Sequence, residues 1–283
     1  TNGQAYLDAL TGIAVCGLGH AHPTVAQAIA EQAATLVHTS NLYQVPLQEA
    51  LAQALCQVSG MELCFFSNSG AEANEAAIKL ARLFGHKKNI AEPAIIVMEN
   101  AFHGRTLATL SATGNKKVQI GFEPLVQGFV RVPFDDVAAV EQAIINNPNI
   151  AAVLVEPIQG EGGIRVPQQG FDYLKQLRAV CNKYDVLLML DEIQTGNGRT
   201  GQYFAYQHTE IKPDVVTTAK GLGNGFPIGA CLVQGKASDL FKAGNHGSTY
   251  GGTPLACRAA LTVVQLLQQG AIENAALMGE RMM

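Results

Sequence analysis

The sequence predicts an α/β protein in which a mostly parallel sheet lies between helices. Short apolar runs alternate with longer segments of helical periodicity, which is typical of βαβ units. Some runs, such as Val186-Leu187-Leu188-Met189-Leu190, are apolar at every position, as in a strand buried on both faces. Polar residues follow these runs directly, and ligands of such sheets bind beyond the carboxyl ends of the strands.

The alternation predicts the order of the elements along the chain. Residues 5–15 are expected to form a short hairpin or an extended arm. Residues 23–37 are expected to form a helix with Pro23 in its first turn. The C-terminal part is expected to contain one long helix over 253–268. Between them we expect strands at 63–66, 93–98, 151–155, 186–190, 215–218 and 229–233, and helices at 71–84, 135–146 and 171–184.

Composition narrows the classes of function. The net charge is -4, the hydrophobic content is 48% and charged residues make up 15%, which argues against disorder. The absence of a basic run argues against nucleic acid or an anionic membrane as the main partner. We find no apolar stretch long enough to span a bilayer and no signal-peptide pattern, although the first residue is not Met. The six cysteines form no C-x-x-C pair, which predicts buried thiols in a reducing cytoplasm and no metal site.

The first candidate site follows the strand expected at 63–66. Ser69 and Glu72 have the S-x-x-E spacing of a capping box at the start of a helix. Small residues there leave backbone N–H groups open, and such a helix N-terminus is a natural phosphate site. Taken alone, the motif indicates only an ordinary capped helix.

Two further strand ends carry aromatic and charged residues. After the strand at 93–98, Phe102 could stack on a planar ring and Arg105 could bind a carboxylate, with His103 between them. After the strand at 151–155, Glu156 and Glu161 lie in a glycine-rich loop. Each motif has an ordinary alternative, because such charges are often solvated or brace a loop.

The fourth and fifth strand ends carry an acid and a lysine. Asp191 ends a buried strand, and a carboxylate there needs a partner such as a protonated ring nitrogen. Lys220 follows an apolar strand, and lysine is rarely buried unless it is paired or reactive. Its amine could form a Schiff base with a carbonyl cofactor. A hydroxyl-rich loop, His246-Gly247-Ser248-Thr249-Tyr250, follows further on.

One motif imitates a dinucleotide-binding site. The segment G-N-G-R-T-G at 196–201 fits G-x-G-x-x-G after a strand, but that fingerprint requires a helix that opens within it. The residues that follow, Q-Y-F-A-Y, are aromatic and not clearly helical. We therefore predict a tight loop at this position.

Taken in order, the motifs resemble those of the class III aminotransferases, a subgroup of the fold-type I enzymes that use pyridoxal 5'-phosphate. Within this class, the likeness is greatest to the acetylornithine aminotransferases and covers essentially the whole chain. The motifs that carry it are S-N-S-G-A-E-A-N-E, F-H-G-R-T, E-P-I-Q-G-E-G-G, D-E-I-Q-T-G-N-G-R-T-G, T-A-K-G-L-G and H-G-S-T-Y-G-G.

The resemblance implies a role for each matching residue. It implies that Lys220 holds the cofactor in a Schiff base and that Asp191 pairs with the pyridine nitrogen, so both are candidate catalytic residues. Thr249 corresponds to a phosphate contact from the neighbouring subunit, which implies a homodimer with shared sites. Candidate substrate-binding residues are Arg105, Glu161 and Ser248. The candidate cofactor-binding residues are Ser69, Gly70, Ala71, Phe102, His103, Asp191, Ile193, Gln194, Lys220 and Thr249.

The resemblance also implies a division of the chain. Residues 1–45 would form an N-terminal arm and helix, and 46–268 the large domain that binds the cofactor. Residues 269–283 would begin a truncated C-terminal domain. The arginine that pairs with the acid at Glu161 in the family lies beyond this sequence, so we expect the chain to be part of a longer protein.

The expected reaction is transfer of the terminal amino group of N-acetylornithine to 2-oxoglutarate, a step of arginine biosynthesis in the cytoplasm. N-succinyl-diaminopimelate is a second possible donor. The alternatives are an ornithine or 4-aminobutyrate aminotransferase, or a protein that binds the cofactor without transaminase activity. F-H-G-R-T and Glu161 occur in the alternative transaminases as well, so they do not discriminate between them.

Overall fold

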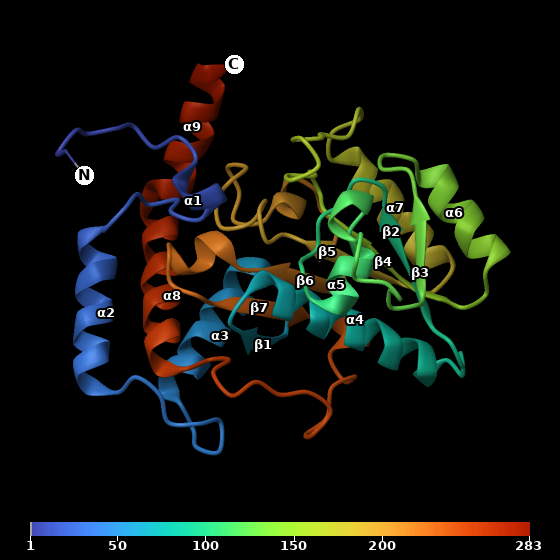
Figure 1. Cartoon of the computed structure of the whole chain (residues 1–283), viewed down its shortest axis with the longest axis horizontal. Helices are drawn as coiled ribbons and strands as arrows, with labels where there is room; N and C mark the ends of the chain where they lie inside the picture. The colour runs from blue at the N-terminus through green and yellow to red at the C-terminus, as the bar shows by residue number, and fades with distance from the viewer. Residues whose placement is uncertain (1) are drawn as a thin grey trace.

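A computed structural model, which describes residues 2–283, has a seven-stranded sheet with helices on both faces (Figure 1). The strand order is β1-β7-β6-β5-β4-β2-β3. Only β7 runs antiparallel to its neighbours, which confirms the predicted mostly parallel sheet. The strands are β1 Leu63–Ser67, β2 Ala94–Met98, β3 Phe129–Val132, β4 Ile150–Val155, β5 Leu187–Asp191, β6 Val215–Thr218 and β7 Gly229–Val233.

The predicted strands are confirmed, with bounds that differ by at most one residue, and β3 was not predicted. β3 is a short edge strand interrupted by Arg131. The Arg131 guanidinium donates hydrogen bonds to the carbonyl oxygens of Met98, Ser111 and Ala112, so this charge is accommodated by backbone acceptors. A four-residue run that contains a charge lacks the apolar pattern that identifies the buried strands.

The helices divide between the two faces of the sheet. α4 packs on the face that carries Ile95 and Val97, whereas α3, α6, α7 and α8 cover the face that carries Ile96 and Met98. This division follows from the alternation of side chains along a strand. The helices are α1 Thr11–Ala14, α2 Pro23–Thr35, α3 Pro46–Ser59, α4 Gly70–Lys87, α5 Leu107–Ala112, α6 Val137–Asn146, α7 Asp172–Lys183, α8 Pro254–Leu266 and α9 Ile272–Met282, with 3₁₀ turns at Lys116–Val118, Ala205–His208, Lys220–Gly223 and Gly235–Ala237.

The N-terminal segment is an extended arm, and the alternative of a hairpin is wrong. Residues 2–10 contain no strand, and α1 is a single irregular turn in which Gly12 and Ile13 have positive φ. α2 starts at Pro23 as predicted and lies beside α8 (Figure 1). α3 was not predicted, although its Pro46 occupies the first helical turn.

The predicted C-terminal helix is confirmed as α8, but the helical path continues beyond it. A π-helical segment, Leu267–Ala271, in which Gly270 has φ 110°, leads directly into α9. The combined segment Pro254–Met282 is long and apolar enough to cross a membrane by length and composition, contrary to the expectation from sequence. Much of its apolar character serves the core, because Ala256, Cys257 and Val263 pack against the sheet.

Six parallel strands, all except β7, direct their carboxyl ends to one edge of the sheet. β1 is parallel to β6 because both pair antiparallel with β7, and β6, β5, β4 and β2 are parallel to one another. The residues that follow β1, β2, β4, β5 and β6 therefore meet at this edge. These segments contain most of the candidate residues identified from the sequence.

Candidate active site

A cavity of about 390 Å³ opens at this edge of the sheet. Its volume lies in the range of small-molecule sites. The ends of β1, β2, β4, β5 and β6 each contribute to its lining. The predicted site residues that line it are Ser69, Gly70, Ala71, Phe102, His103, Arg105, Glu161, Asp191, Ile193, Gln194 and Lys220.

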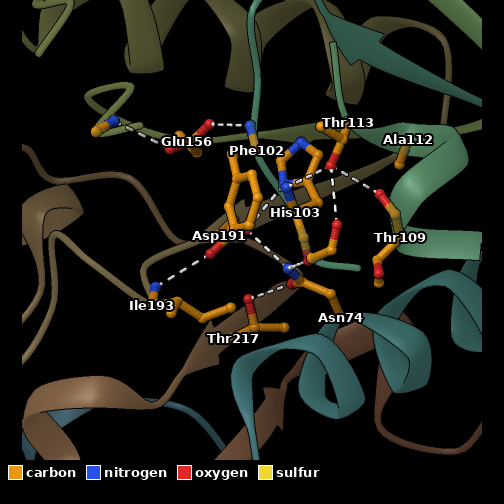
Figure 2. A network of polar contacts seen from close by, with 12 residues as sticks. Asn74, Phe102, His103, Thr109, Ala112, Thr113, Glu156, Asp191, Ile193 and Thr217 are labelled. Carbon is orange, nitrogen blue, oxygen red and sulfur yellow. Dashed lines mark hydrogen bonds and ion pairs between the residues drawn. The ribbon is translucent and has the colours of Figure 1, made fainter. Parts of the chain in front are cut away.

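Asp191 is the most firmly held charged group of the cavity. Its side chain is 4% exposed, and Oδ2 accepts hydrogen bonds of 2.8 Å from both Nδ1 of His103 and Nδ2 of Asn74 (Figure 2). Oδ1 accepts a hydrogen bond of 3.1 Å from the backbone N–H of Ile193. Three donors stabilise a buried carboxylate that would be costly without them.

His103 is buried directly behind Asp191. Because Nδ1 faces a carboxylate, Nδ1 must carry the ring proton, and this assigns the tautomer. The backbone N–H of His103 donates to Oγ1 of Thr113, which fixes the loop behind the ring. Nε2 of His103 is buried and has no hydrogen-bond partner among the described residues.

The N-terminus of α4 forms one wall of the cavity. Oγ of Ser69 accepts a hydrogen bond from the backbone N–H of Glu72, as the predicted capping box requires. The Glu72 carboxylate binds the N–H of Asn68 instead of that of Ser69, so the reciprocal half of the box is shifted by one residue. The backbone N–H groups of Gly70 and Ala71 make no hydrogen bond within residues 2–283, which leaves two donors for an anion.

Gly70 is also required by packing. A Cβ atom at this position would lie 2.8 Å from Cδ1 of Ile193, which is closer than side-chain atoms approach. Ile193 and Phe102 both line the cavity, and they come from the ends of different strands, β5 and β2. An apolar side chain and an aromatic ring are thus available to hold a planar group.

Lys220 follows β6 and has a left-handed backbone conformation with φ 43°. Such a conformation is rare for a residue with a side chain and persists only where the surroundings impose it. Burial lowers the pKa of Lys220, while nearby Asp191 and Glu156 act to raise it. A lower pKa increases the fraction of neutral amine, which is the nucleophilic form.

Glu156 adds a second buried carboxyl group to the lining. Its two oxygens accept hydrogen bonds from the backbone N–H groups of Phe102, at 2.9 Å, and Gly160, at 3.1 Å. Burial raises the pKa of Glu156 to about 7. Glu156 therefore connects the loop that carries Phe102 to the glycine-rich loop after β4, and the expectation that it braces these loops agrees with its contacts.

Arg105 and Glu161 are exposed at the mouth of the cavity. The Arg105 guanidinium lies over the Phe102 ring, 5.6 Å from its centroid, in a cation–π contact. The end of the Gln194 side chain packs closely against Gly160, so a side chain at that glycine would displace it. Arg105 makes no ion pair within residues 2–283 and is available to bind an anion.

Ser248 and Thr249 do not line this cavity within one chain. Oγ of Ser248 accepts hydrogen bonds from Nδ2 of Asn68, at 3.2 Å, and from the N–H of Gly251, at 2.9 Å. Thr249 lines a separate small pocket next to His38. The loop expected to contribute a contact from a neighbouring subunit is therefore tied to the β1 end through Asn68.

The structure adds three buried polar residues that the sequence did not identify. Asn74 and Thr217 belong to the network around Asp191. Glu192 is fully buried beside it and accepts hydrogen bonds from Thr195 and from the N–H groups of Ala205 and Tyr206. Burial raises the pKa of Glu192 to about 7. The sequence could have indicated Asn74, because it is a polar residue on the otherwise apolar face of α4.

The loop at 196–201 opens no helix, so the predicted tight loop is confirmed and the dinucleotide fingerprint is excluded. All six cysteines are free. Within residues 2–283, no group of three or more His, Cys, Asp or Glu side chains has the geometry of a metal site.

Comparison with known proteins places this geometry in a family. The family described as aminotransferase class-III matches residues 1–283. The chain belongs to the class-III aminotransferases. The acetylornithine aminotransferase of Nitrosomonas europaea is 59% identical over 281 residues, which cover 99% of this chain and 71% of the relative. Acetylornithine aminotransferase 1 of Bordetella parapertussis is 52% identical over 276 residues, which cover 97% of this chain and 70% of the relative.

Solved structures agree with this membership. The ornithine aminotransferase of Toxoplasma gondii ME49 matches with a TM-score of 0.92 and 37% identity, over 97% of this chain and 65% of that chain. The acetylornithine aminotransferase of Elizabethkingia anophelis matches with a TM-score of 0.82 and 36% identity, over 96% of this chain and 64% of that chain. The class-III aminotransferase chain described here thus spans about two thirds of these structures.

Class-III aminotransferases depend on pyridoxal phosphate, and a second structure of the T. gondii enzyme has this cofactor at partial occupancy in its active site. The residues of this chain fit the group. The free N–H groups of Gly70 and Ala71 suit a phosphate, and the anionic Asp191 suits a protonated ring nitrogen. Lys220 lines the same cavity and supplies an amine.

Proposed function

We propose that this class-III aminotransferase transfers the terminal amino group of N-acetylornithine to 2-oxoglutarate in arginine biosynthesis. The main support for aminotransferase chemistry is that Lys220 and Asp191 line one cavity. The N-terminus of α4, with its free N–H groups, lines the same cavity. The choice of donor is supported by acetylornithine aminotransferases that are 52–59% identical to nearly the whole chain. N-succinyl-diaminopimelate is proposed as a second donor of similar chemistry.

In this proposal Lys220 has two successive roles. Its amine would form the covalent link to the carbonyl carbon of the cofactor, whose oxygen leaves as water, and burial supports this by lowering the pKa of Lys220. Once an amino donor has displaced it, the Lys220 amine would remove a proton from the donor carbon and deliver it to the cofactor carbon. Lys220 thus acts as general base and then as general acid.

Asp191 would stabilise positive charge on the bound ring. Oδ1 would accept the N–H of the pyridine ring, while Oδ2 is held by His103 and Asn74. Bound pyridoxal phosphate supplies a conjugated ring that withdraws electrons from the reacting carbon. The ionised Asp191 makes this possible because it keeps the ring nitrogen protonated.

The remaining contacts orient the cofactor. Ser69, Gly70 and Ala71 would bind the phosphate at the start of α4, and Gln194 would lie near the ring hydroxyl. Phe102 and Ile193 would hold the two faces of the ring, with Glu156 and Gly70 fixing their positions. A ring held on both faces presents its reactive carbon to Lys220 in one orientation.

Substrate recognition is assigned to the mouth of the cavity. Arg105 is exposed there and makes no ion pair with any other residue that the structure describes, so we propose that it binds a substrate carboxylate. Glu161 is proposed to pair with an arginine that belongs to the family but lies outside this sequence. Ser248 contacts Asn68 at the β1 end, and its proposed contact with substrate depends on how a second subunit is arranged.

We also propose a homodimer in which Thr249 completes the phosphate site of the partner. This is supported by the distance of Thr249 from the cavity of its own chain, since it lines a separate pocket. Large apolar side chains are exposed on the N-terminal segment, on loops and at the first residue of α5, which is unusual for a surface that faces only water. These side chains are Tyr6, Leu7, Leu10, Ile13, Leu42, Tyr43, Leu107, Ile120, Phe122 and Tyr250.

Complementation between subunits tests the shared site. Heterodimers of a Lys220→Ala chain and a Thr249→Val chain should contain one intact site, and activity should return when the two inactive variants are mixed and refolded together. Sedimentation should give the mass of two chains. A monomer that is fully active would reject the dimer and the role of Thr249 together.

We place the enzyme in the cytoplasm, which the six free cysteines support. We further propose that 46–268 is the large cofactor domain, preceded by the arm and helix of 1–45, and that 269–283 begins the C-terminal domain.

A substrate panel tests the function. Purified full-length protein is assayed for glutamate formation from 2-oxoglutarate with N-acetylornithine, N-succinyl-diaminopimelate, ornithine or 4-aminobutyrate as donor. N-acetylornithine should give the highest kcat/KM. A higher value with ornithine or 4-aminobutyrate would reject the proposed donor but retain the chemistry. Cofactor absorbance without glutamate from any donor would reject the transaminase.

A further inference from the structure

Asn74 is fully buried, at 0% exposure, in the network around Asp191. It lies on α4, and its Nδ2 group donates hydrogen bonds of 2.8 Å to Oδ2 of Asp191 and to the carbonyl oxygen of His103 (Figure 2). One amide group thus connects the two residues that form the anionic end of the cavity. Asn74 does not line the cavity and acts on it only through Asp191 and His103.

Thr217 determines how the Asn74 amide is oriented. Oγ1 of Thr217 donates a hydrogen bond of 2.7 Å to Oδ1 of Asn74. Rotation of the amide by 180° would place Oδ1 against two acceptors, the carboxylate of Asp191 and the carbonyl of His103. Thr217 is the register partner of Asp191 in the adjacent strand β6, so the sheet itself fixes the donor relative to the acid.

The hydrogen bonds around Asp191 occupy its two carboxylate oxygens unequally. A carboxylate oxygen has about two acceptor sites. Oδ2 uses both, for Asn74 and His103, whereas Oδ1 accepts only the N–H of Ile193 among the described residues. One acceptor site therefore remains on Oδ1.

We propose that Asn74 and Thr217 are positioning residues, which hold Asp191 ionised and reserve Oδ1 for the ring nitrogen of the cofactor. This inference rests on the proposed function, since it assigns Asp191 to that nitrogen. Neither residue contacts a reacting atom. They act because a donated hydrogen bond favours the charged form of a carboxylate, and because a filled Oδ2 leaves one direction for a new partner.

Thr217→Val and Thr217→Ser provide a matched pair of variants. Valine replaces the hydroxyl by a methyl group of similar shape, whereas serine keeps the hydroxyl. Thr262→Val is the control, because Thr262 is also a buried threonine whose hydroxyl donates to a carbonyl, that of Arg258 on α8. Asn74→Asp is the stronger change, because it places a second acid beside Asp191 and removes the donor.

Three measurements separate positioning from folding. Dissociation constants for pyridoxal phosphate come from titration of the cofactor-free protein, and the bound cofactor's absorbance is followed against pH. Circular dichroism and thermal unfolding report the folded fraction. We expect Thr217→Val to weaken cofactor binding by about tenfold, the upper end for a hydrogen bond between neutral groups, and Asn74→Asp by about a hundredfold, the scale of a hydrogen bond to a charged group.

The pH midpoint of the absorbance band should rise in Thr217→Val and Asn74→Asp. When the ring nitrogen is protonated less fully, the ring withdraws fewer electrons from the nitrogen that links Lys220 to the cofactor. That linking nitrogen is then more basic, and its midpoint lies at higher pH. Thr217→Ser and Thr262→Val should keep the wild-type midpoint. A structural defect alone would lower the folded fraction without moving the midpoint.

This inference would be overturned if folded Thr217→Val bound pyridoxal phosphate with wild-type affinity and kept the wild-type pH midpoint of the absorbance band. The proposed function would not be affected. If wild-type protein does not bind the cofactor through Lys220, the proposed function and the inference fail together. If Asn74→Asp does not fold, the Thr217 pair decides the outcome.

Discussion

The Nδ1 atom of His103 lies 2.8 Å from Oδ2 of Asp191, and neither side chain is more than 4% exposed. This contact joins the end of β5 to the loop after β2, so the acid depends on a second strand end for its orientation. His103 was identified from sequence only as a candidate cofactor contact. Because it donates a hydrogen bond to Asp191, His103 stabilises the negative charge of that carboxylate.

Replacing His103 with Ala should lower kcat and weaken cofactor binding, because Asp191 loses one of two side-chain donors. Removing a hydrogen bond to a buried charge costs about 1.5–3 kcal/mol, or about 10–100-fold. His103→Asn is the control, since its Nδ2 can occupy the position of Nδ1. Steady-state kinetics should show a smaller defect in the asparagine variant, and equal defects would contradict the role of Nδ1.

Lys220 should be more reactive than exposed lysines in the cofactor-free protein. Burial lowers its pKa, so a larger fraction is neutral at pH 8 than for an unperturbed lysine. Brief treatment with an amine-directed reagent, followed by peptide mass mapping, should label Lys220 faster than exposed Lys116. Added pyridoxal phosphate should protect Lys220 alone. Slower labelling of Lys220 across the pH range would count against the lowered pKa.

Gly70→Ala should weaken cofactor binding because the new Cβ would lie 2.8 Å from Cδ1 of Ile193. Overpacking of this kind costs about 1–3 kcal/mol and would displace Ile193 into the cavity. The double variant Gly70→Ala/Ile193→Ala removes the clash and should bind the cofactor more tightly than Gly70→Ala. Titration of cofactor fluorescence measures both, and no recovery in the double variant would disprove a steric cause.

The buried Glu192 should make stability depend on pH. Burial raises its pKa from 4.5 to about 7, so between these values the folded protein binds a proton that the unfolded chain releases. The contribution of Glu192 to the free energy of unfolding should therefore fall as pH rises from about 5 to 7, by an amount on the order of 1–3 kcal/mol.

Urea unfolding at several pH values measures this slope. In Glu192→Gln the slope between pH 5 and 7 should be smaller, even though the variant loses a hydrogen bond and is less stable overall. Glu210→Gln, which alters an exposed carboxyl group, should retain the wild-type slope. A Glu192→Gln slope as steep as that of the wild type would exclude Glu192 as the titrating group.

Apolar patterning was sufficient to predict most of the fold. β5 is apolar at four consecutive positions before Asp191, and α4 repeats small and apolar residues with helical spacing. β3 was missed because Arg131 interrupts its apolar pattern, and the carbonyl groups that accept hydrogen bonds from Arg131 come from distant segments. Continuation of the helix beyond Gln268 was also missed, because the sequence contains Gly270, which the π-helical segment tolerates.

The site was predictable wherever a residue follows a strand directly. Lys220 and Asp191 have that position, and the parallel topology brings them into one cavity. Asn74 was not predicted because it lies inside a helix, 117 positions before the acid that it contacts. No local pattern contains such a contact. Only the polarity of Asn74 on the apolar face of α4 hinted at a partner.

The place of β7 in the sheet has a consequence for biosynthesis. β1 is made early, yet within the sheet it pairs only with β7, at residues 229–233. A ribosome must therefore extend the nascent polypeptide by more than 160 positions beyond Ser67 before β1 can dock beside its partner. Until then the segment that joins β1 to the helix beginning at Gly70 lacks its strand partner, so the wall of the cavity that this segment forms is completed late in synthesis.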